Sequence, residues 1–280
     1  MRKMRSIILA ISFIFPASIF GQYYGVENPI AENWSVGINI GVSGLMADVQ
    51  TDLIGYQGGF YVQKLISPSL DVRLGFDLGS NTGLDVMPSQ GFRFNSALNG
   101  ERDSMRFYDS TMKVFHNYRM SYRQISFLFK WNLNRAFSPT GSEKYDLYAL
   151  AGISAYFYKT QTNVFDERTG EIYPYESINL ADPLGVKYQL KNLLDTSYET
   201  LAQQDNLNST RFGNYIYNPS FVIGFGGRYK LTEDIALGLE GKMQFIGDDL
   251  LDGQQFLETN EQSLNNDRPF RVAITLDYTF

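Results

Sequence analysis

The sequence contains no cysteine and only one histidine among its 280 residues. Without cysteine, the chain has no disulfide bonds, thiolate metal sites, cysteine nucleophile or lipid anchor on cysteine. The sequence also lacks any run of 18 consecutive apolar residues, which argues against a membrane protein built from helices. A membrane barrel is not excluded in this way, because its strands place apolar residues only at every second position.

Basic residues are the minority among the charged ones, with 24 Lys and Arg against 30 Asp and Glu. Three of them lie within the first five residues, directly before a short apolar run at residues 7–15. This arrangement is typical of a secretory signal peptide, and we expect one at residues 1–21 with cleavage after Gly21. The remaining chain then has a net charge of −9, which argues against nucleic acid as a partner.

Aromatic residues are abundant, with 19 Tyr, 21 Phe and 2 Trp. Tyr and Trp combine an apolar ring with a polar tip, so they are suited to the boundary between a membrane and water. A soluble β-sandwich also favours aromatic residues. Composition therefore leaves both classes of protein open, and the order of the residues has to decide between them.

The last twelve residues, 269–280, alternate strictly between two kinds of side chain. One face carries Phe270, Val272, Ile274, Leu276, Tyr278 and Phe280. A period of two indicates a strand with one apolar face. The segment resembles the last strand of outer-membrane barrels, which ends in Phe and is read by the barrel-assembly machinery. The resemblance implies an insertion signal at Tyr278 and Phe280.

Seven further segments are predicted to be strands, which gives eight in all. They are residues 34–43, 56–65, 70–79, 118–131, 145–158, 221–229 and 235–245. In residues 118–131 the apolar positions change parity, which predicts a β-bulge near Gln124 or a stem that rises above the membrane. The segment 145–158 is apolar on both faces, and its orientation stays open.

The connectors between these strands alternate between short and long, as in outer-membrane barrels. We therefore predict an all-β fold, a closed antiparallel transmembrane β-barrel formed by residues 34–280 in a bacterial outer membrane. Residues 22–33 are expected to be a periplasmic lead. The connector 160–215 is long enough for an extra hairpin or a short helix, so a barrel of ten strands is the alternative.

Charged residues fall on the face that is otherwise rich in glycine and small residues, which is the lumen side of a narrow barrel. These are Arg73, Asp77, Arg228, Glu240, Lys242, Arg271 and Asp277. They can line a path for ions, or they can pair and fill the lumen. We favour the filled lumen, because unpaired charges in a narrow interior are costly and eight strands leave room only for side chains.

Two other groups are weaker candidates for chemistry. The carboxylates of Asp248, Asp249 and Asp252 are of the kind that binds calcium, but their spacing does not match an EF-hand, and a polar turn is the alternative. The single histidine, His116, stands near Asp109 and Ser110, as a hydrolase at the rim of a barrel would require. We expect a solvated rim histidine instead, with no catalytic residue and no cofactor.

Residues 221–253 resemble small outer-membrane barrels of Bacteroidota, including OmpA-like barrels and the PorG- and PorT-like barrels linked to type IX secretion. The resemblance is carried by Gly224, Gly226, Tyr229, Leu231, Leu239, Glu240 and the Asp-Asp-Leu-Leu-Asp-Gly run at 248–253, and residues 34–43 are similar to the first strand of such proteins. It implies a non-enzymatic structural, assembly or secretion-accessory role, or the binding of another outer-membrane or surface protein by the long acidic loops. A narrow channel for small solutes or ions is the alternative.

Overall fold

The computed structural model describes residues 34–47, 49, 51–89, 114–134, 144–202, 210–254 and 267–280. The expected signal peptide and periplasmic lead lie outside these residues. The helical elements of the described part are η2 (Tyr175–Ser177) and α3 (Pro183–Leu193). The long strands are β1 (Trp34–Met46), β2 (Thr51–Ser67), β3 (Leu70–Leu84), β4 (Asn117–Asn132), β5 (Tyr145–Thr162), β8 (Tyr215–Lys230), β9 (Ile235–Ile246) and β10 (Arg268–Thr279).

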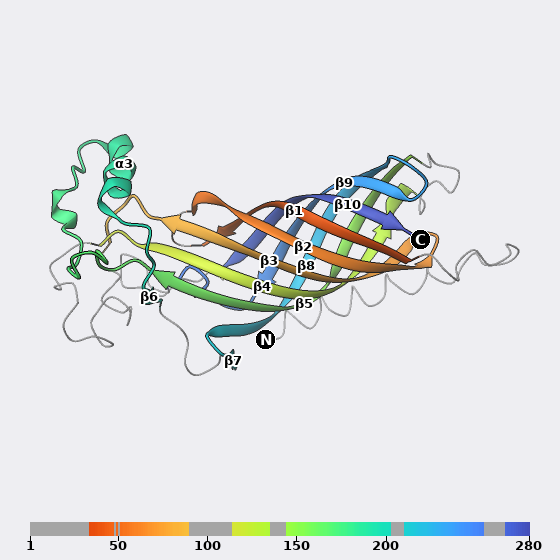
Figure 1. Cartoon of the computed structure of the whole chain (residues 1–280), viewed down its shortest axis with the longest axis horizontal. Helices are drawn as coiled ribbons and strands as arrows, with labels where there is room; N and C mark the ends of the chain where they lie inside the picture. The colour runs from red at the N-terminus through yellow and green to blue at the C-terminus, as the bar shows by residue number, and fades with distance from the viewer. Residues whose placement is uncertain are drawn as a thin grey trace, which may run out of the picture. The chain divides into compact units, whose positions relative to one another are not determined.

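The eight long strands form a closed antiparallel barrel (Figure 1). Each strand pairs with its neighbour along the chain, β5 pairs with β8, and β10 pairs with β1 to close the ring. Closure leaves no free strand edge, which is the condition for a sheet to cross a membrane. The predicted eight-stranded barrel is confirmed.

The segment between β5 and β8 is ordered where the structure describes it. It contains η2, α3 and two very short strands, β6 (Thr200–Leu201) and β7 (Thr210–Phe212). β6 pairs only with the end of β5, and β7 pairs only with the start of β8. These strands therefore extend the sheet at one end of the barrel. They do not add two transmembrane strands, so the ten-stranded alternative is wrong.

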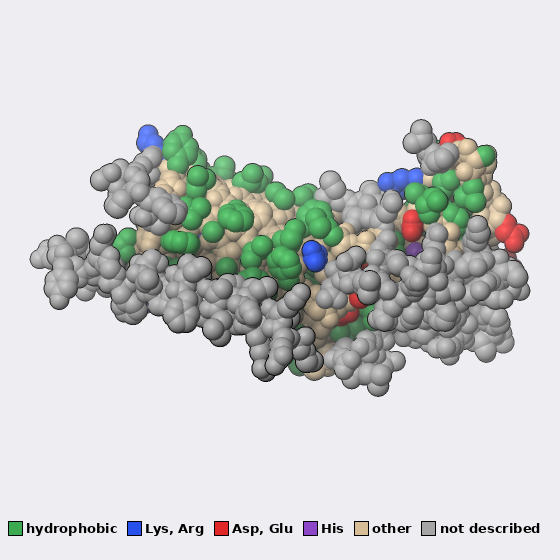
Figure 2. Space-filling view, turned by 180° about the vertical axis from the view of Figure 1, so that it is seen from behind, with side chains coloured by type: hydrophobic (Ala, Val, Ile, Leu, Met, Phe, Trp, Pro, Cys, Tyr) green, Lys and Arg blue, Asp and Glu red, His purple; other side chains and the backbone are tan. Residues whose placement is uncertain are grey.

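Side chains alternate between the two faces of each long strand, and the apolar face points outward. Ile40 is 70% exposed and Leu239 is 58% exposed, whereas Glu240 next to Leu239 is 1% exposed. Figure 2 shows hydrophobic side chains spread over the barrel wall, with few charged ones among them. A wall that is apolar outside and polar inside is the reverse of a soluble barrel, and it fits an environment of lipid.

Aromatic rings mark both edges of this apolar wall. At the end with the short turns lie Trp34, Trp131, Tyr145, Tyr229 and Tyr278. At the opposite end Phe157, Phe212 and Tyr217 form a cluster, with the ring centroids of Phe157 and Tyr217 5.4 Å apart. Such girdles lie at the two membrane–water interfaces. We call the first end the turn end and the second the loop end; by the asymmetry of outer-membrane barrels they are periplasmic and extracellular.

Candidate functional site

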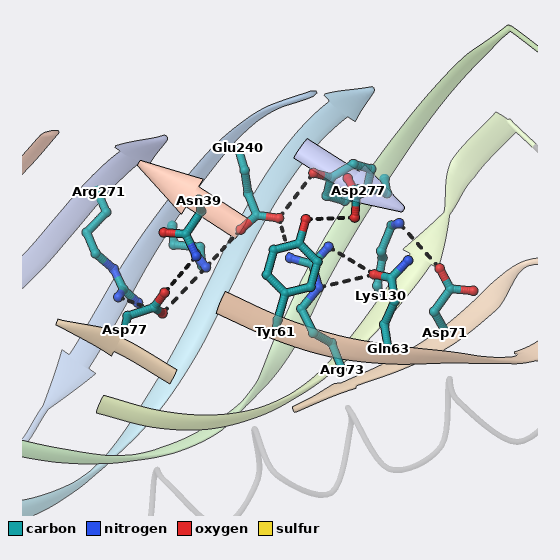
Figure 3. A network of polar contacts seen from close by, with 12 residues as sticks. Asn39, Tyr61, Gln63, Asp71, Arg73, Asp77, Lys130, Glu240, Arg271 and Asp277 are labelled. Carbon is teal, nitrogen blue, oxygen red and sulfur yellow. Dashed lines mark hydrogen bonds and ion pairs between the residues drawn. The ribbon is translucent and has the colours of Figure 1, made fainter. Parts of the chain in front are cut away.

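The lumen holds a connected network of ion pairs (Figure 3). Glu240 on β9 accepts from two cations, Arg73 Nη1 at 2.6 Å and Lys242 Nζ at 2.8 Å. Asp77 on β3 lies 3.0 Å from Arg271 Nη1 and accepts a hydrogen bond of 2.9 Å from Asn39. The pair of Arg73 and Glu240 joins strands on different parts of the wall, so the network ties the barrel across its interior.

Two more ion pairs lie closer to the turn end. Lys130 Nζ is 3.3 Å from Asp71 Oδ2, and Arg228 Nε is 2.7 Å from Asp146 Oδ2. The inward-facing charges of the described strands are therefore Arg73, Lys130, Arg228, Lys242 and Arg271 against Asp71, Asp77, Asp146, Glu240 and Asp277. The two signs are equal in number, so these charges compensate one another without bound ions from solvent.

Tyrosine rings fill the space between the charges. Tyr61 donates to Asp277 at 2.7 Å, and its ring lies 4.0 Å from the guanidinium carbon of Arg73. Each ring rests on a glycine directly across the strand pair: Tyr61 on Gly37 and Tyr148 on Gly226. A side chain at either glycine would overlap the ring. The glycines of the inner face thus make room for aromatic side chains in the lumen.

All seven charged residues expected in the lumen face the interior of the barrel; six are buried and Arg228 is partly buried. Six of the seven form ion pairs with other inward-facing residues, and Asp277 accepts a hydrogen bond from Tyr61. The sequence analysis missed three other charged members, Asp71, Lys130 and Asp146. Asp71 lies on the same face of β3 as Arg73, so the alternation was a usable signal for it. Lys130 lies between the outward residues Phe129 and Trp131 of β4, so alternation was a usable signal for it too. Asp146 lies on β5, whose orientation the sequence left open.

The lumen changes character toward the loop end, where an apolar plug replaces the charges. It consists of Leu45, Val49, Tyr118, Met120, Tyr122, Tyr156, Tyr158, Ile216, Ile246 and Leu251, all of them buried. Tyr122 and Tyr156 stack with their ring centroids 5.3 Å apart. The described interior is therefore filled at two levels, by ion pairs nearer the turn end and by packed rings nearer the loop end.

The apolar plug explains the change of parity in β4. The strand pairs with β3 and β5 in continuous register over its length, so the bulge expected near Gln124 is absent. Tyr118, Met120 and Tyr122 point inward, whereas Ile125 points outward. In the part of the barrel that faces lipid, the outer face of the wall is apolar and the interior is polar. Toward the loop end the interior is apolar instead, as it is in a soluble barrel. The alternative of a stem above the membrane fits this arrangement.

A second apolar core, which we call the outer cap, lies at the loop end (Figure 1, around α3). It consists of Leu84, Val114, Phe115, Val164, Tyr173, Tyr175, Ile178, Val186 and Leu190. The carboxylate of Asp182 accepts from the backbone N–H of Gly185 and so caps the first turn of α3. Segments from two different loops thus share one core, which makes the cap a folded unit.

His116 lies beside the outer cap and is buried, which corrects the expectation of a solvated rim histidine. Burial lowers the pKa of His116 to about 4, so its imidazole is neutral at physiological pH. Its Nε2 has no hydrogen-bond partner among the described residues. Asp109 and Ser110 lie outside the described residues.

Two of the three aspartates considered for metal binding, Asp248 and Asp252, act as hydrogen-bond acceptors in the turn after β9. Asp248 accepts from Tyr158 and Asn218, both at 2.5 Å, and Asp252 accepts from the backbone N–H of Val49 at 3.0 Å. In the part of the chain that is described, no group of three or more His, Asp or Glu side chains is placed to hold a metal ion. The contacts favour the alternative of a polar turn, held to the barrel wall by its carboxylates.

The fold defines the class of protein: the chain is an outer-membrane β-barrel, closed by eight antiparallel strands with an apolar outer wall. No described helix is both long and apolar enough to cross a membrane. No protein-family model and no curated protein sequence matches the chain.

Solved structures with a similar arrangement are all distant. The attachment invasion locus protein Ail of Yersinia pestis, in complex with the heparin analogue sucrose octasulfate, shares 9% identity over 89% of this chain and 98% of its own, with a TM-score of 0.41. Neisserial surface protein A shares 7% over 89% and 96%, with a TM-score of 0.37. The outer membrane protease OmpT from Escherichia coli shares 8% over 92% and 100%, with a TM-score of 0.39. Likeness at this level says nothing about ligand or activity.

Proposed function

We propose that this protein is a non-conducting, non-enzymatic barrel that presents its outer cap to another outer-membrane or surface protein. The observation that carries the proposal is the filled lumen. Charges in equal number occupy one level, and packed rings occupy the next. An interior of this kind is suited to rigidity, because paired buried charges and close-packed rings leave little room for solutes.

The loop end supplies the surface for contact. The outer cap is a folded unit, which lowers the entropy lost on binding compared with a free loop. Tyr188 on α3 is 72% exposed and Leu180 just before it is 50% exposed. Exposed aromatic and aliphatic side chains on a rigid support are typical of protein interfaces. On the resemblance to barrels linked to type IX secretion, a secretion or assembly complex is one place where such a partner is expected.

Conductance in planar lipid bilayers tests the filled lumen. We expect the reconstituted protein to show no stable conductance. A variant with Arg73→Ser and Glu240→Ser among the ion pairs, and with Tyr122→Ser and Tyr156→Ser in the apolar plug, loosens both levels and serves as the control that the assay detects an open lumen. A large, stable conductance of the unmodified protein would refute the proposal and favour the narrow channel.

Crosslinking in native outer membranes tests the partner. Replacing residues 171–194 by a short Gly-Ser linker removes α3 and much of the outer cap, while the eight long strands are retained. We expect this variant to insert normally and to lose a crosslinked partner that the intact protein and the lumen variant both retain. An unchanged pattern of crosslinked proteins would mean that the outer cap does not contact the partner.

A further inference from the structure

The outer face of β4 and β5 carries three cations at the loop end of the barrel. Arg119 and Arg123 lie on β4, and Lys159 lies on β5 directly opposite Ser121. Ser121 stands between the two arginines on the same face of β4. All four side chains are on the outward side of the strands, where none is fully buried. We call this group the cation notch.

The register brings the three cations around one small residue. Diagonal neighbours on one face of an antiparallel pair have Cβ atoms about 7–8 Å apart, so Lys159 lies at this distance from both Arg119 and Arg123. Ser121 pairs with Ser80 on β3, which places two small hydroxyl side chains side by side beneath the long ones. The register thus groups three long cationic side chains around two small hydroxyl side chains on one face of the sheet.

No carboxylate neutralises these cations within the described part of the chain. Arg119 donates to the backbone oxygen of Thr196 at 3.3 Å and lies 4.2 Å from the ring of Tyr198. Arg123 lies 4.7 Å from the ring of Tyr215. These contacts fix the direction of the guanidinium groups, and none of them brings a carboxylate from the described residues beside these groups. The notch thus contrasts with the lumen, where every base has an acid beside it.

The notch lies at the edge of the apolar wall. Trp131 marks the turn-end girdle on β4, and Arg123 is eight residues away along the same strand. At about 3.3 Å per residue and a tilt of about 40°, Arg123 lies roughly 20 Å above Trp131 along the membrane normal. The apolar band of such barrels is about 25 Å tall, and Arg123 pairs with Phe157 of the loop-end girdle, so Arg123 lies just inside the upper edge of the band. Lys159 and Arg119 lie further along the strands, at the headgroup level of the outer leaflet.

We propose that the cation notch binds the phosphate groups of an anionic glycolipid of the outer leaflet. Arginine forks match phosphate oxygens bidentately, and the Ser121 hydroxyl supplies a further donor, whereas the Ser80 hydroxyl donates to the backbone oxygen of Met120. The wall below the notch suits the acyl chains, since Ile125 is 49% exposed and Ile153 is 64% exposed. A phosphate attached to a lipid therefore satisfies both parts of this surface, whereas free phosphate or an acidic protein segment satisfies only the upper part.

Native mass spectrometry of the full chain in neutral detergent, titrated with diphosphoryl lipid A, tests this assignment. The test variant carries Arg119→Gln, Arg123→Gln and Lys159→Gln. The matched control carries Lys64→Gln, Lys144→Gln and Lys230→Gln, which remove the same charge at the turn end. Altered migration of unboiled samples on gels reports whether each variant is folded. We expect the test variant to lose about tenfold in affinity for lipid A and the control to lose less than twofold.

Two further arms identify the source of the phosphate. Lipid A without phosphate groups should bind the intact protein as weakly as diphosphoryl lipid A binds the test variant. Inorganic phosphate at millimolar concentration should fail to displace diphosphoryl lipid A. Equal loss in the test and control variants, or equal binding of the dephosphorylated lipid, would overturn the site. Efficient displacement by inorganic phosphate or by an acidic peptide would overturn the choice of a lipid as the occupant.

Discussion

Replacing Glu240 by Gln should destabilise the barrel, because one carboxylate holds two cations in the lumen. The change preserves shape but leaves five inward bases against four inward acids. Removing one partner of a buried ion pair typically costs about 3–5 kcal/mol. Arg73 keeps hydrogen bonds of 3.2 and 3.3 Å to Gln63, and Lys242 keeps Asp77 at 3.8 Å. We therefore expect the lower end, about 3 kcal/mol.

Urea unfolding in lipid vesicles measures this loss. With a slope of about 2 kcal/mol per molar urea, 3 kcal/mol lowers the midpoint by about 1.5 M. A second change, Lys242→Met, returns the lumen to equal numbers of acids and bases and should recover a large part of the loss. The matched control is Glu233→Gln in the exposed turn between β8 and β9, which should shift the midpoint by less than about 0.3 M.

Two outcomes of these unfolding measurements would contradict the role assigned to Glu240. If Glu240→Gln and Glu233→Gln lower the midpoint equally, the ion pairs add nothing to stability. If Lys242→Met makes the Glu240→Gln variant less stable still, the cation stabilises the lumen through contacts other than Glu240. Either result would mean that charge compensation is not how Glu240 and Lys242 stabilise the barrel.

Three other predictions concern separate parts of the chain. Leu239→Arg should cost about 2–4 kcal/mol in the same unfolding assay, because Leu239 faces lipid, and a harmless outcome would contradict its orientation. Phe280→Ser should lower insertion into membranes far more than Thr279→Ser does, and equal effects would leave the last strand without a special signal. Burial and the negative charges of Asp252 and Asp249 raise the pKa of Asp267 well above its usual range, so the folded turn keeps a proton on this carboxyl group. The unfolded chain releases that proton above the ordinary Asp pKa of about 4, so the folded turn loses stability as pH rises above this value. Hydrogen-exchange protection of the Leu251 amide, which donates to Asp267, should fall with rising pH in the unmodified protein and stay level in Asp267→Asn; parallel profiles would contradict this reasoning.

The barrel could be predicted from sequence because its strands have a simple period. In β10 and β1 the outward residues are apolar apart from Arg268 and Gly44, and most inward residues are small or polar, so alternation alone identifies the strands. The same rule failed in β5, where Tyr148 and Leu150 fill the lumen while Leu147 faces lipid. When both faces are apolar, alternation carries no orientation, and Asp146 was missed for this reason. Lys130 lies on β4 between the outward residues Phe129 and Trp131, so alternation was a usable signal for it.

Partners within the lumen could not be predicted at all. The sequence places Arg73, Arg228 and Arg271 on the inner face and does not say which of them pairs with Glu240. In the structure Arg228 pairs with Asp146 and Arg271 with Asp77. The actual partner, Arg73, comes from β3, which is not a sheet neighbour of β9. Which side chains meet across a lumen depends on strand tilt and on the register of every intervening pair, and neither is written in the local pattern.

The outer face of β4 changes along the strand from apolar residues to arginines, and this change fixes how deep the protein lies in its bilayer. A shift outward by two residues would move the ring of Trp131 into the hydrocarbon and bring Ile125 to the level that Arg123 occupies now. A shift inward by the same step would drag Arg123 into the hydrocarbon, where a cation is strongly disfavoured. The barrel therefore has little freedom to slide along the membrane normal. In a thinner or thicker bilayer, the lipid around this wall must stretch or compress to match the protein, because the protein cannot adjust its depth to match the lipid.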